Sequence, residues 1–208
     1  MDGIVNFQFF IISAIIIIIA PGPDFIYVTT RGISDGNKAG IISALGISAG
    51  LLIHTLFAAF GLSAIIQASR VVYLIIKYLG AGYLIFIGIK VMMSRNMLND
   101  FDRDKSGNSR DFFKQGVLTN IFNPKAIVTF MAFLPQFVNV NIAHPITQFI
   151  FLGLILSTIS IIWFGVVGYF AGILGNLVKQ SSLIQTWMKY ISGAIMMLLG
   201  LKLAFEKK

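Results

Sequence analysis

The sequence predicts an all-α integral membrane protein, with six transmembrane helices arranged as two inverted three-helix repeats. Hydrophobic residues make up 57% of the 208 residues and charged residues only 12%, whereas about 25% of the residues of a soluble domain are charged. The mean hydropathy is +0.86. Proline-containing breaks also interrupt two of the hydrophobic spans, about half a chain apart, and this pattern is typical of membrane folds built from two repeats.

Six apolar stretches are long enough to cross a bilayer core, which takes about 20 residues. They cover residues 4–30, 40–66, 71–93, 113–140, 146–174 and 187–205. We expect one membrane domain, in which residues 1–93 form the first repeat, 94–112 a polar cytoplasmic loop and 113–208 the second, inverted repeat. The N-terminus lacks the basic region of a signal peptide, so we expect the first stretch to remain as a span.

The first span is expected to break at Pro21-Gly22-Pro23, directly after the isoleucine run 15–19 and Ala20. Proline has no backbone N–H and clashes with the preceding turn, which ends a helix. It also suits the first turn of a new helix. A second half-helix is therefore predicted to begin at Pro23, with Asp24 in its first turn.

The second span contains His54 and the pair Gly46 and Gly50. Histidine changes charge near neutral pH, which suits a proton relay formed by His54 and Asp24. The alternative, which is equally plausible from the sequence, is that His54 only forms a hydrogen bond between helices. The G-x-x-x-G spacing, repeated at Gly168 and Gly172, favours close packing of helices. The same spacing is compatible with packing between two copies of the chain in a homodimer.

The fourth span is expected to break at Asn123-Pro124-Lys125. Asparagine is a good N-cap, and Pro124 then takes the first helical position. Each new helix start exposes unpaired N–H groups and the positive end of the helix dipole, and such ends bind anions.

The third and sixth spans carry the clearest internal similarity, and the second and fifth a weaker one. Residues 77–91 read KYLGAGYLIFIGIKV and residues 189–203 read KYISGAIMMLLGLKL. The identities pair Lys77, Tyr78, Gly88 and Lys90 with Lys189, Tyr190, Gly200 and Lys202. Pro23 likewise pairs with Pro124. Three spans in each half make the second half inverted, although chance similarity among apolar helices is the alternative.

The distribution of Lys and Arg predicts the orientation, because cytoplasmic loops carry an excess of both. The segments after the first, third and fifth spans hold Arg31, Lys38, the cluster from Arg95 to Lys114, Lys179 and Lys189. We therefore expect an outside N-terminus and a cytoplasmic loop at 94–111. The C-terminal tail does not fit this rule, because it carries Lys202, Lys207 and Lys208 and six spans would place it outside.

The two breaks together predict a site for a zwitterion. Asp24 would bind an ammonium group, while Lys125 and the helix ends would bind a carboxylate. The residues of this site are Pro21, Gly22, Pro23, Asp24, Asn123, Pro124 and Lys125. The alternative is a purely structural pair of Asp24 and Lys125, because charges inside a membrane usually pair with each other, or proline kinks that only shape the bundle.

Several classes of function are disfavoured. The chain has no cysteine, which removes thiolate ligands and cysteine nucleophiles. No catalytic pair and no nucleotide motif is present, so we expect neither an enzyme nor a cofactor, and no metal site. The net charge of +8 reflects loop lysines and arginines in a protein surrounded by lipid, so we expect no nucleic-acid partner.

The motifs in residues 21–66, 80–91 and 113–138 resemble those of the LysE/RhtB family of amino-acid exporters. The shared features are PGP, the R-G-x-x-x-G-x-x-A-G run, the histidine of the second span, and NPK followed by LPQF. The resemblance implies a multi-pass protein of the bacterial cytoplasmic (inner) membrane, a secondary transporter that exports amino acids, with the proton as the expected coupling ion. Family members vary at the position after PGP, which Asp24 occupies in this sequence.

A basic amino acid would need a further buried carboxylate, and none is evident, so we expect a neutral substrate. A cation or heavy-metal exporter is the second interpretation, and a membrane scaffold that transports nothing is the third.

Overall fold

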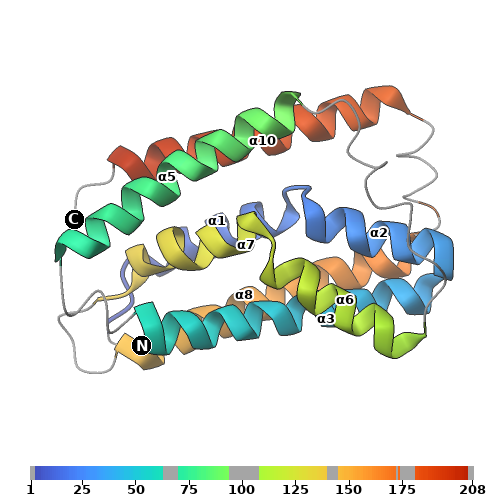
Figure 1. The fold of residues 1–208 in the computed structure, drawn as a ribbon, viewed down its shortest axis with the longest axis horizontal. Coiled ribbons are helices and arrows are strands. Elements are labelled where there is room, and N and C mark those ends of the chain that lie inside the picture. Colours follow the sequence, from blue (N-terminus) through green and yellow to red (C-terminus); the bar gives the residue numbers. More distant parts are fainter. Residues whose placement is uncertain are drawn as a thin grey trace.

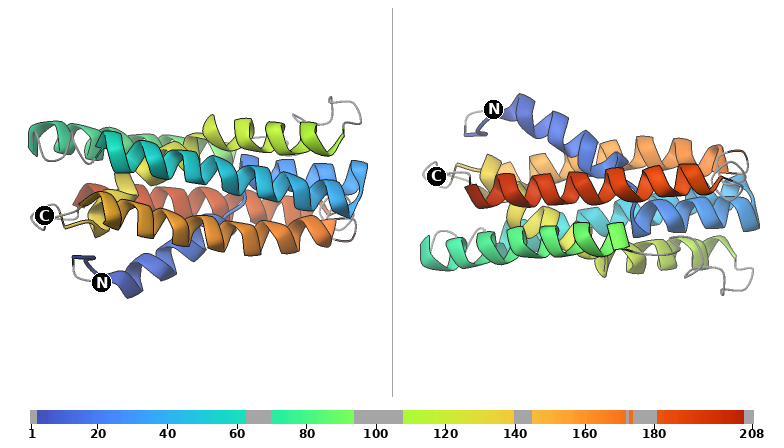
Figure 2. Two further views of the ribbon diagram at one scale, coloured as in Figure 1. Left: turned by 90° about the horizontal axis from the view of Figure 1, so that it is seen from below. Right: turned by 90° about the horizontal axis from the view of Figure 1, so that it is seen from above.

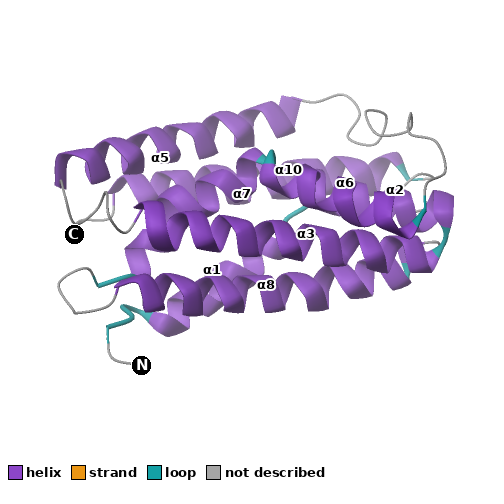
Figure 3. Ribbon diagram, turned by 60° about the horizontal axis from the view of Figure 1, so that its bottom comes forward, coloured by secondary structure: helices purple, strands orange, loops and turns teal. Residues whose placement is uncertain are grey.

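The computed structural model describes residues 3–62, 70–93, 108–139, 145–171, 173 and 181–205. Nearly all of this part of the chain is helical, and its only β-type pairing is one isolated bridge between Ile4 and Val138. Most of the helices run roughly along one long axis, and the first helix is inclined to it (Figures 1 and 2). Short loop segments lie at the ends of the bundle and also inside it (Figure 3).

The described residues form six helical units in sequence order, several of them made of consecutive pieces. They are α1 (Phe7–Ile19) and α2 (Pro23–Asp35); α3 (Asn37–Phe57) with the π-helical η1 (Ala58–Leu62); α5 (Arg70–Met93); α6 (Ser109–Ile121) and α7 (Pro124–Val128) with the π-helical η2 (Thr129–Phe133) and the 3-10 helix η3 (Leu134–Phe137); α8 (Pro145–Tyr169); and α10 (Ser182–Phe205).

Both predicted helix breaks are confirmed. The axes of α1 and α2 meet at 49°, and the axes of α6 and the helix that runs from Pro124 to Phe137 meet at 51°. Gly22 is the N-cap of α2 and Asn123 the N-cap of α7, so a proline stands at the first position of each new helix. The Asn123 side chain accepts a hydrogen bond of 2.9 Å from the Lys125 N–H, as predicted for an N-cap.

The lengths and compositions of the helices fit a multi-pass membrane protein. Residues 37–61 and α8, each 25 residues long, are apolar enough to cross a bilayer singly, and each of the two bent pairs qualifies as one broken span. Helices α5 and α10 each have 24 residues, which corresponds to about 36 Å at 1.5 Å per residue.

Segments from the two halves of the chain pack side by side and run in opposite directions. Helix α3 lies along α8, and α5 along α10. In Figure 1, α1 and α2 run from left to right, whereas α6 and α7 run from right to left. Glycines allow the close contacts: a Cβ atom added at Gly40 would lie 2.6 Å from the Gly168 carbonyl oxygen, and one at Gly88 would lie 2.7 Å from that of Gly193.

The predicted packing role of Gly46 and Gly50 is also confirmed, with α6 as the partner helix. A Cβ atom at Gly46 would collide with the Phe113 carbonyl oxygen, and one at Gly50 would lie 2.7 Å from the Asn120 side chain. These contacts lie within one chain. Of the second pair, Gly168 contacts Gly40, and Gly172 lies outside the described residues.

Two segments differ from the sequence-based expectation. Arg31 does not lie in a loop: α2 continues through it to Asp35, and its side chain is only 5% exposed. Its guanidinium donates to Gln115 Oε1 at 2.9 Å and to Asp35 Oδ2 at 3.3 Å, which compensates the buried charge. The predicted loop 94–112 lies outside the described residues except at its end, where α6 already begins at Ser109 through a capping box of Asn108 and Asp111.

Candidate functional site

The two breaks meet in the middle of the bundle. Helix α1 ends at its C-cap Ala20, and α7 begins at Pro124, directly after its N-cap Asn123. The Lys125 ammonium reaches across and donates a hydrogen bond to the Ala20 carbonyl oxygen, 2.7 Å away. This carbonyl belongs to the last turn of a helix, where intrahelical donors are missing. The contact therefore joins one broken helix to the other.

Lys125 is a buried cation in an electrostatically unusual position. Its side chain is 6% exposed, and it stands in the first turn of α7. The positive end of a helix dipole favours an anion in the first turn rather than a cation. The carbonyl dipole of Ala20 supplies partial compensation but no full negative charge. An anion beside the Lys125 ammonium would therefore be favoured both by the side chain and by the helix end.

Asp24 accepts its hydrogen bond from an amide and not from a lysine. Its side chain is 4% exposed, and its Oδ2 atom accepts a hydrogen bond of 3.1 Å from the Asn120 amide. Within the described residues, no ion pair joins Asp24 to Lys125, and the second carboxylate oxygen, Oδ1, has no hydrogen-bond partner. The nearby Asn123 side-chain nitrogen also lacks one. Two buried polar groups at the breaks are thus left with unused hydrogen-bonding capacity.

Asn120 connects Asp24 to His54. Its side chain is fully buried; the amide donates to Asp24, and its backbone oxygen lies 3.3 Å from Nε2 of His54. The His54 ring is stacked on Phe130, with 5.4 Å between ring centroids. Gly50, one turn before His54, leaves room for the Asn120 side chain. Asp24 and His54 therefore do not touch directly but share one residue, and Nε2 can donate to that oxygen only in one tautomer or when charged.

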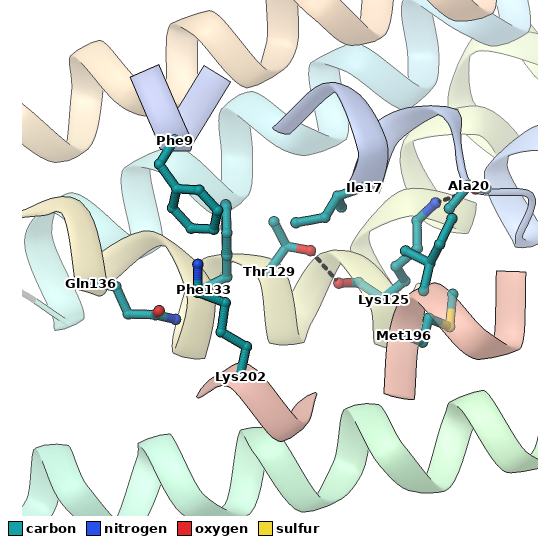
Figure 4. A pocket seen from close by; sticks show the side chains of 10 residues that line it. Phe9, Ile17, Ala20, Lys125, Thr129, Phe133, Gln136, Met196 and Lys202 are labelled. Atoms are coloured by element: carbon teal, nitrogen blue, oxygen red, sulfur yellow. Dashed lines mark hydrogen bonds between the residues drawn. The ribbon is translucent and has the colours of Figure 1, made fainter. Parts of the chain in front are cut away.

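A cavity opens beside the breaks, between α1, the segment α7–η3 and α10 (Figure 4). The cavity is small in this structure, with a volume of about 20 Å³, and it is partly open to the outside. Its lining is formed by Phe9, Ile17, Ala20, Lys125, Thr129, Phe133, Gln136, Ile195, Met196 and Lys202. Apolar side chains dominate, two ammonium groups are present, and none of these ten residues carries a carboxylate.

The cavity has a deep end and a shallow end. Ala20, Lys125 and Thr129 are at most 6% exposed, whereas Gln136 is half-buried and Lys202 is exposed. Figure 4 shows the Lys125 and Lys202 ammonium groups at opposite ends of the space, with Thr129 and Phe133 between them. The deep end is thus the junction of the two broken helices.

Of the seven residues predicted for the site, Lys125 alone is among those that line this cavity. Gly22 lies close to Lys125, since a Cβ atom added at Gly22 would be 3.6 Å from the Lys125 ammonium. Asp24 and Asn123 are buried at the same junction. Sequence reasoning missed Asn120, Gln136 and Lys202; the one available signal was the pairing of Lys202 with Lys90 between the repeats.

The residues described here include no group of three or more His, Cys, Asp or Glu side chains that could hold a metal ion. The heavy-metal interpretation of the sequence therefore gains no support from a ligand cluster in this part of the chain.

Comparisons with known proteins agree with the sequence resemblance. The model of the LysE type translocator family matches residues 15–207. An uncharacterized membrane protein of Bacillus subtilis, YrhP, is 32% identical over 91% of this chain and 93% of its own length. A leucine efflux protein of an Enterobacter species is 32% identical over 77% of each chain, and one of Klebsiella pneumoniae is 31% identical over 76% of this chain and 75% of its own.

No solved structure matches the chain significantly. The family match covers nearly the whole sequence and includes both helix breaks, the Asn120 position and the helix that carries Lys202. The chain belongs to the LysE type translocator family.

Proposed function

We propose that this protein is a secondary transporter that exports neutral amino acids across the bacterial cytoplasmic membrane. The observation that carries the proposal is the Lys125 ammonium, which is buried at the junction of two broken helices and lines a mostly apolar cavity. A charged group inside a membrane protein is a functional candidate by default. Relatives named leucine efflux protein support an amino acid as the substrate.

The chemistry of the cavity supports a substrate with one carboxylate and an apolar side chain. The carboxylate would take the place of the Ala20 carbonyl as partner of Lys125, and charge-assisted hydrogen bonds of this kind are roughly twice as strong as neutral ones. Carbonyl oxygens at the end of α1 would bind the ammonium group of the substrate. Asp24 would bind it instead if the carboxylate moved toward the cavity. Ile17, Phe133 and Met196 would contact the apolar side chain.

In this proposal six spans form two inverted repeats, with the site between them. The antiparallel pairing of α3 with α8 and of α5 with α10 supports it, as does the meeting of the two breaks. The N-terminus would lie outside. The α2 end that carries Arg31 and the start of α6 would then lie at the cytoplasmic end, where positive charge is expected.

Proton coupling would use Asp24, with Asn120 as its link to His54. Asp24 accepts a hydrogen bond from the Asn120 amide and makes no direct ion pair, so it can take up a proton without breaking one. A substrate that binds next to Lys125 would change the charge beside Asp24, and this would link proton binding to substrate binding through electrostatics.

The test uses the purified protein in proteoliposomes loaded with labelled leucine. We expect efflux of labelled leucine to be faster with an inward proton gradient. Unlabelled leucine, isoleucine or methionine loaded together with the labelled leucine should reduce it. Lysine or arginine as the preferred competitor would contradict neutral specificity, and absence of efflux for every amino acid would contradict transport. Asp24→Asn should remove the response to the proton gradient while leucine–leucine exchange persists; an unchanged response would exclude Asp24 from coupling.

A further inference from the structure

Lys202 stands at the shallow end of the cavity, on the last helix of the chain. It is exposed, it lines the cavity, and its ammonium lies 3.0 Å from the centroid of the Phe9 ring. A cation over an aromatic face is held there electrostatically. Phe9 is in turn 6.0 Å from Phe137 between ring centroids, so that the lysine rests on a packed aromatic surface rather than moving freely in solvent.

The charges around the cavity have one sign. Lys125 occupies the deep end and Lys202 the shallow end, and the eight other lining residues are uncharged. The buried Asp24 carboxylate, which is not among the lining residues, interacts electrostatically with Lys125 at the deep end. The ring beneath Lys202 is neutral, so the positive charge at the shallow end is not cancelled. Low-dielectric walls lined by one sign of charge raise the local concentration of the opposite ion and repel ions of the same sign.

We propose that Lys202 is a specificity-determining residue that makes the mouth of this cavity selective against cations. Lys202 contacts Phe9 near the start of α1, so in the proposed orientation this mouth faces the outside. From that side it admits zwitterions and anions that carry a carboxylate and rejects amino acids with a positively charged side chain. The substrate part of this inference rests on the proposed function, whereas the electrostatic part concerns the cavity alone and is measurable without transport.

Lys90 provides a matched control. It is the counterpart of Lys202 in the internal repeat, lies near the end of α5 and is exposed, but it is not among the cavity residues. Replacing either lysine by methionine removes the same charge from an exposed helix position and keeps a long apolar side chain. Any difference between the two variants therefore reports the position of the charge.

The first experiment uses the absence of native cysteine. Ile195 lines the cavity and is half-buried, seven residues before Lys202, or about 10 Å along the helix. In the Ile195→Cys protein, the rates of labelling by a sulfonate-bearing and by a trimethylammonium-bearing methanethiosulfonate are compared. We expect the sulfonate-to-ammonium rate ratio to fall about tenfold with Lys202→Met, as one charge at this distance implies, and to stay unchanged with Lys90→Met.

An unchanged ratio in Lys202→Met, an equal fall in Lys90→Met, or no reaction with either reagent would each overturn the inference. The second experiment measures competition by lysine added outside the vesicles in the leucine efflux assay, where Lys202→Met should become about tenfold more sensitive to lysine and Lys90→Met should not. If the wild-type protein moves no amino acid while the labelling ratio still depends on Lys202, the proposed function fails and the charge selectivity of the cavity stands.

Discussion

The Lys125 ammonium donates a 2.7 Å hydrogen bond to the backbone carbonyl oxygen of Ala20. This contact joins the first turn of one broken helix to the end of the other, from residues 105 positions apart in the sequence. An anion that binds at the deep end of the cavity competes with this carbonyl for the same ammonium. The contact is therefore both a structural link between the two halves and the point where a substrate would act.

The carboxylate is expected to be the group recognised at the deep end. In a Thr129→Cys protein, which places a thiol next to Lys125, leucine should slow labelling by a neutral thiol reagent. Leucinamide, which has the same side chain but no carboxylate, should protect at least about tenfold less, since hydrogen bonds to charged groups contribute roughly 1.5–3 kcal/mol. Equal protection by both compounds would exclude carboxylate recognition at this position.

Replacing Asn120 should affect both stability and transport. Asn120→Ala leaves Asp24 without its amide donor, and an unsatisfied buried polar group costs about 1–3 kcal/mol. We expect a lower melting temperature in detergent and slower leucine efflux. Leu118→Ala, an exposed change on the same helix, should leave both nearly unchanged. Wild-type stability in Asn120→Ala would show that the hydrogen bond to Asp24 contributes nothing to the fold.

The close contact of α3 with α6 predicts that an alanine at Gly46 lowers the stability of the protein, whereas an alanine at Gly82 does not. Gly46→Ala should destabilise the protein by about 1–3 kcal/mol, the usual cost of overpacking, because the added methyl group meets the Phe113 backbone. Gly82→Ala, where no atom lies within 4 Å, should be neutral or slightly stabilising. The comparison is made by thermal unfolding in detergent, and a Gly46 variant as stable as wild type would contradict this packing.

Arg31 should be sensitive even to a conservative change. Its guanidinium donates to two partners and lies over the rings of Tyr27 and Phe112, 5.8 and 5.5 Å from their centroids. Lysine keeps the charge but not the planar fork. We expect Arg31→Lys to lower the melting temperature clearly, whereas Arg110→Lys, at an exposed position of α6, should not. Equal effects would indicate that charge alone matters at position 31.

The features that could be predicted from the sequence depend on local rules. The helix starts at Pro23 and Pro124 follow from the backbone chemistry of proline, and the cap at Asn123 follows from its side chain. The apolar stretch 4–30 ends directly before Arg31, so the sequence places this residue in a loop. Its partner Gln115 lies 84 residues away, so the compensation that keeps Arg31 inside a helix is invisible to local reasoning.

The rest of the site depends on tertiary packing. Asn120 precedes the second break by three residues, and nothing in its sequence context distinguishes it, yet the packing of α3 against α6 places it between Asp24 and His54. Lys202 belongs to the last span and meets Phe9 of the first only because α10 packs beside α1. The alignment of the two halves pairs Asp24 with Lys125. In the structure each has a different hydrogen-bond partner, and the two charges interact only at a longer distance.

The central claim is that Lys125 binds the substrate at the junction of the two breaks. The most direct measurement compares leucine efflux from proteoliposomes that contain equal amounts of folded wild-type protein, Lys125→Met and Lys114→Met. Lys114 is an exposed lysine of α6 and serves as the control. We predict at least a tenfold loss in Lys125→Met, the lower end of the range expected for a charge-assisted hydrogen bond, and no loss in Lys114→Met. Wild-type efflux in a folded Lys125→Met protein would contradict the claim.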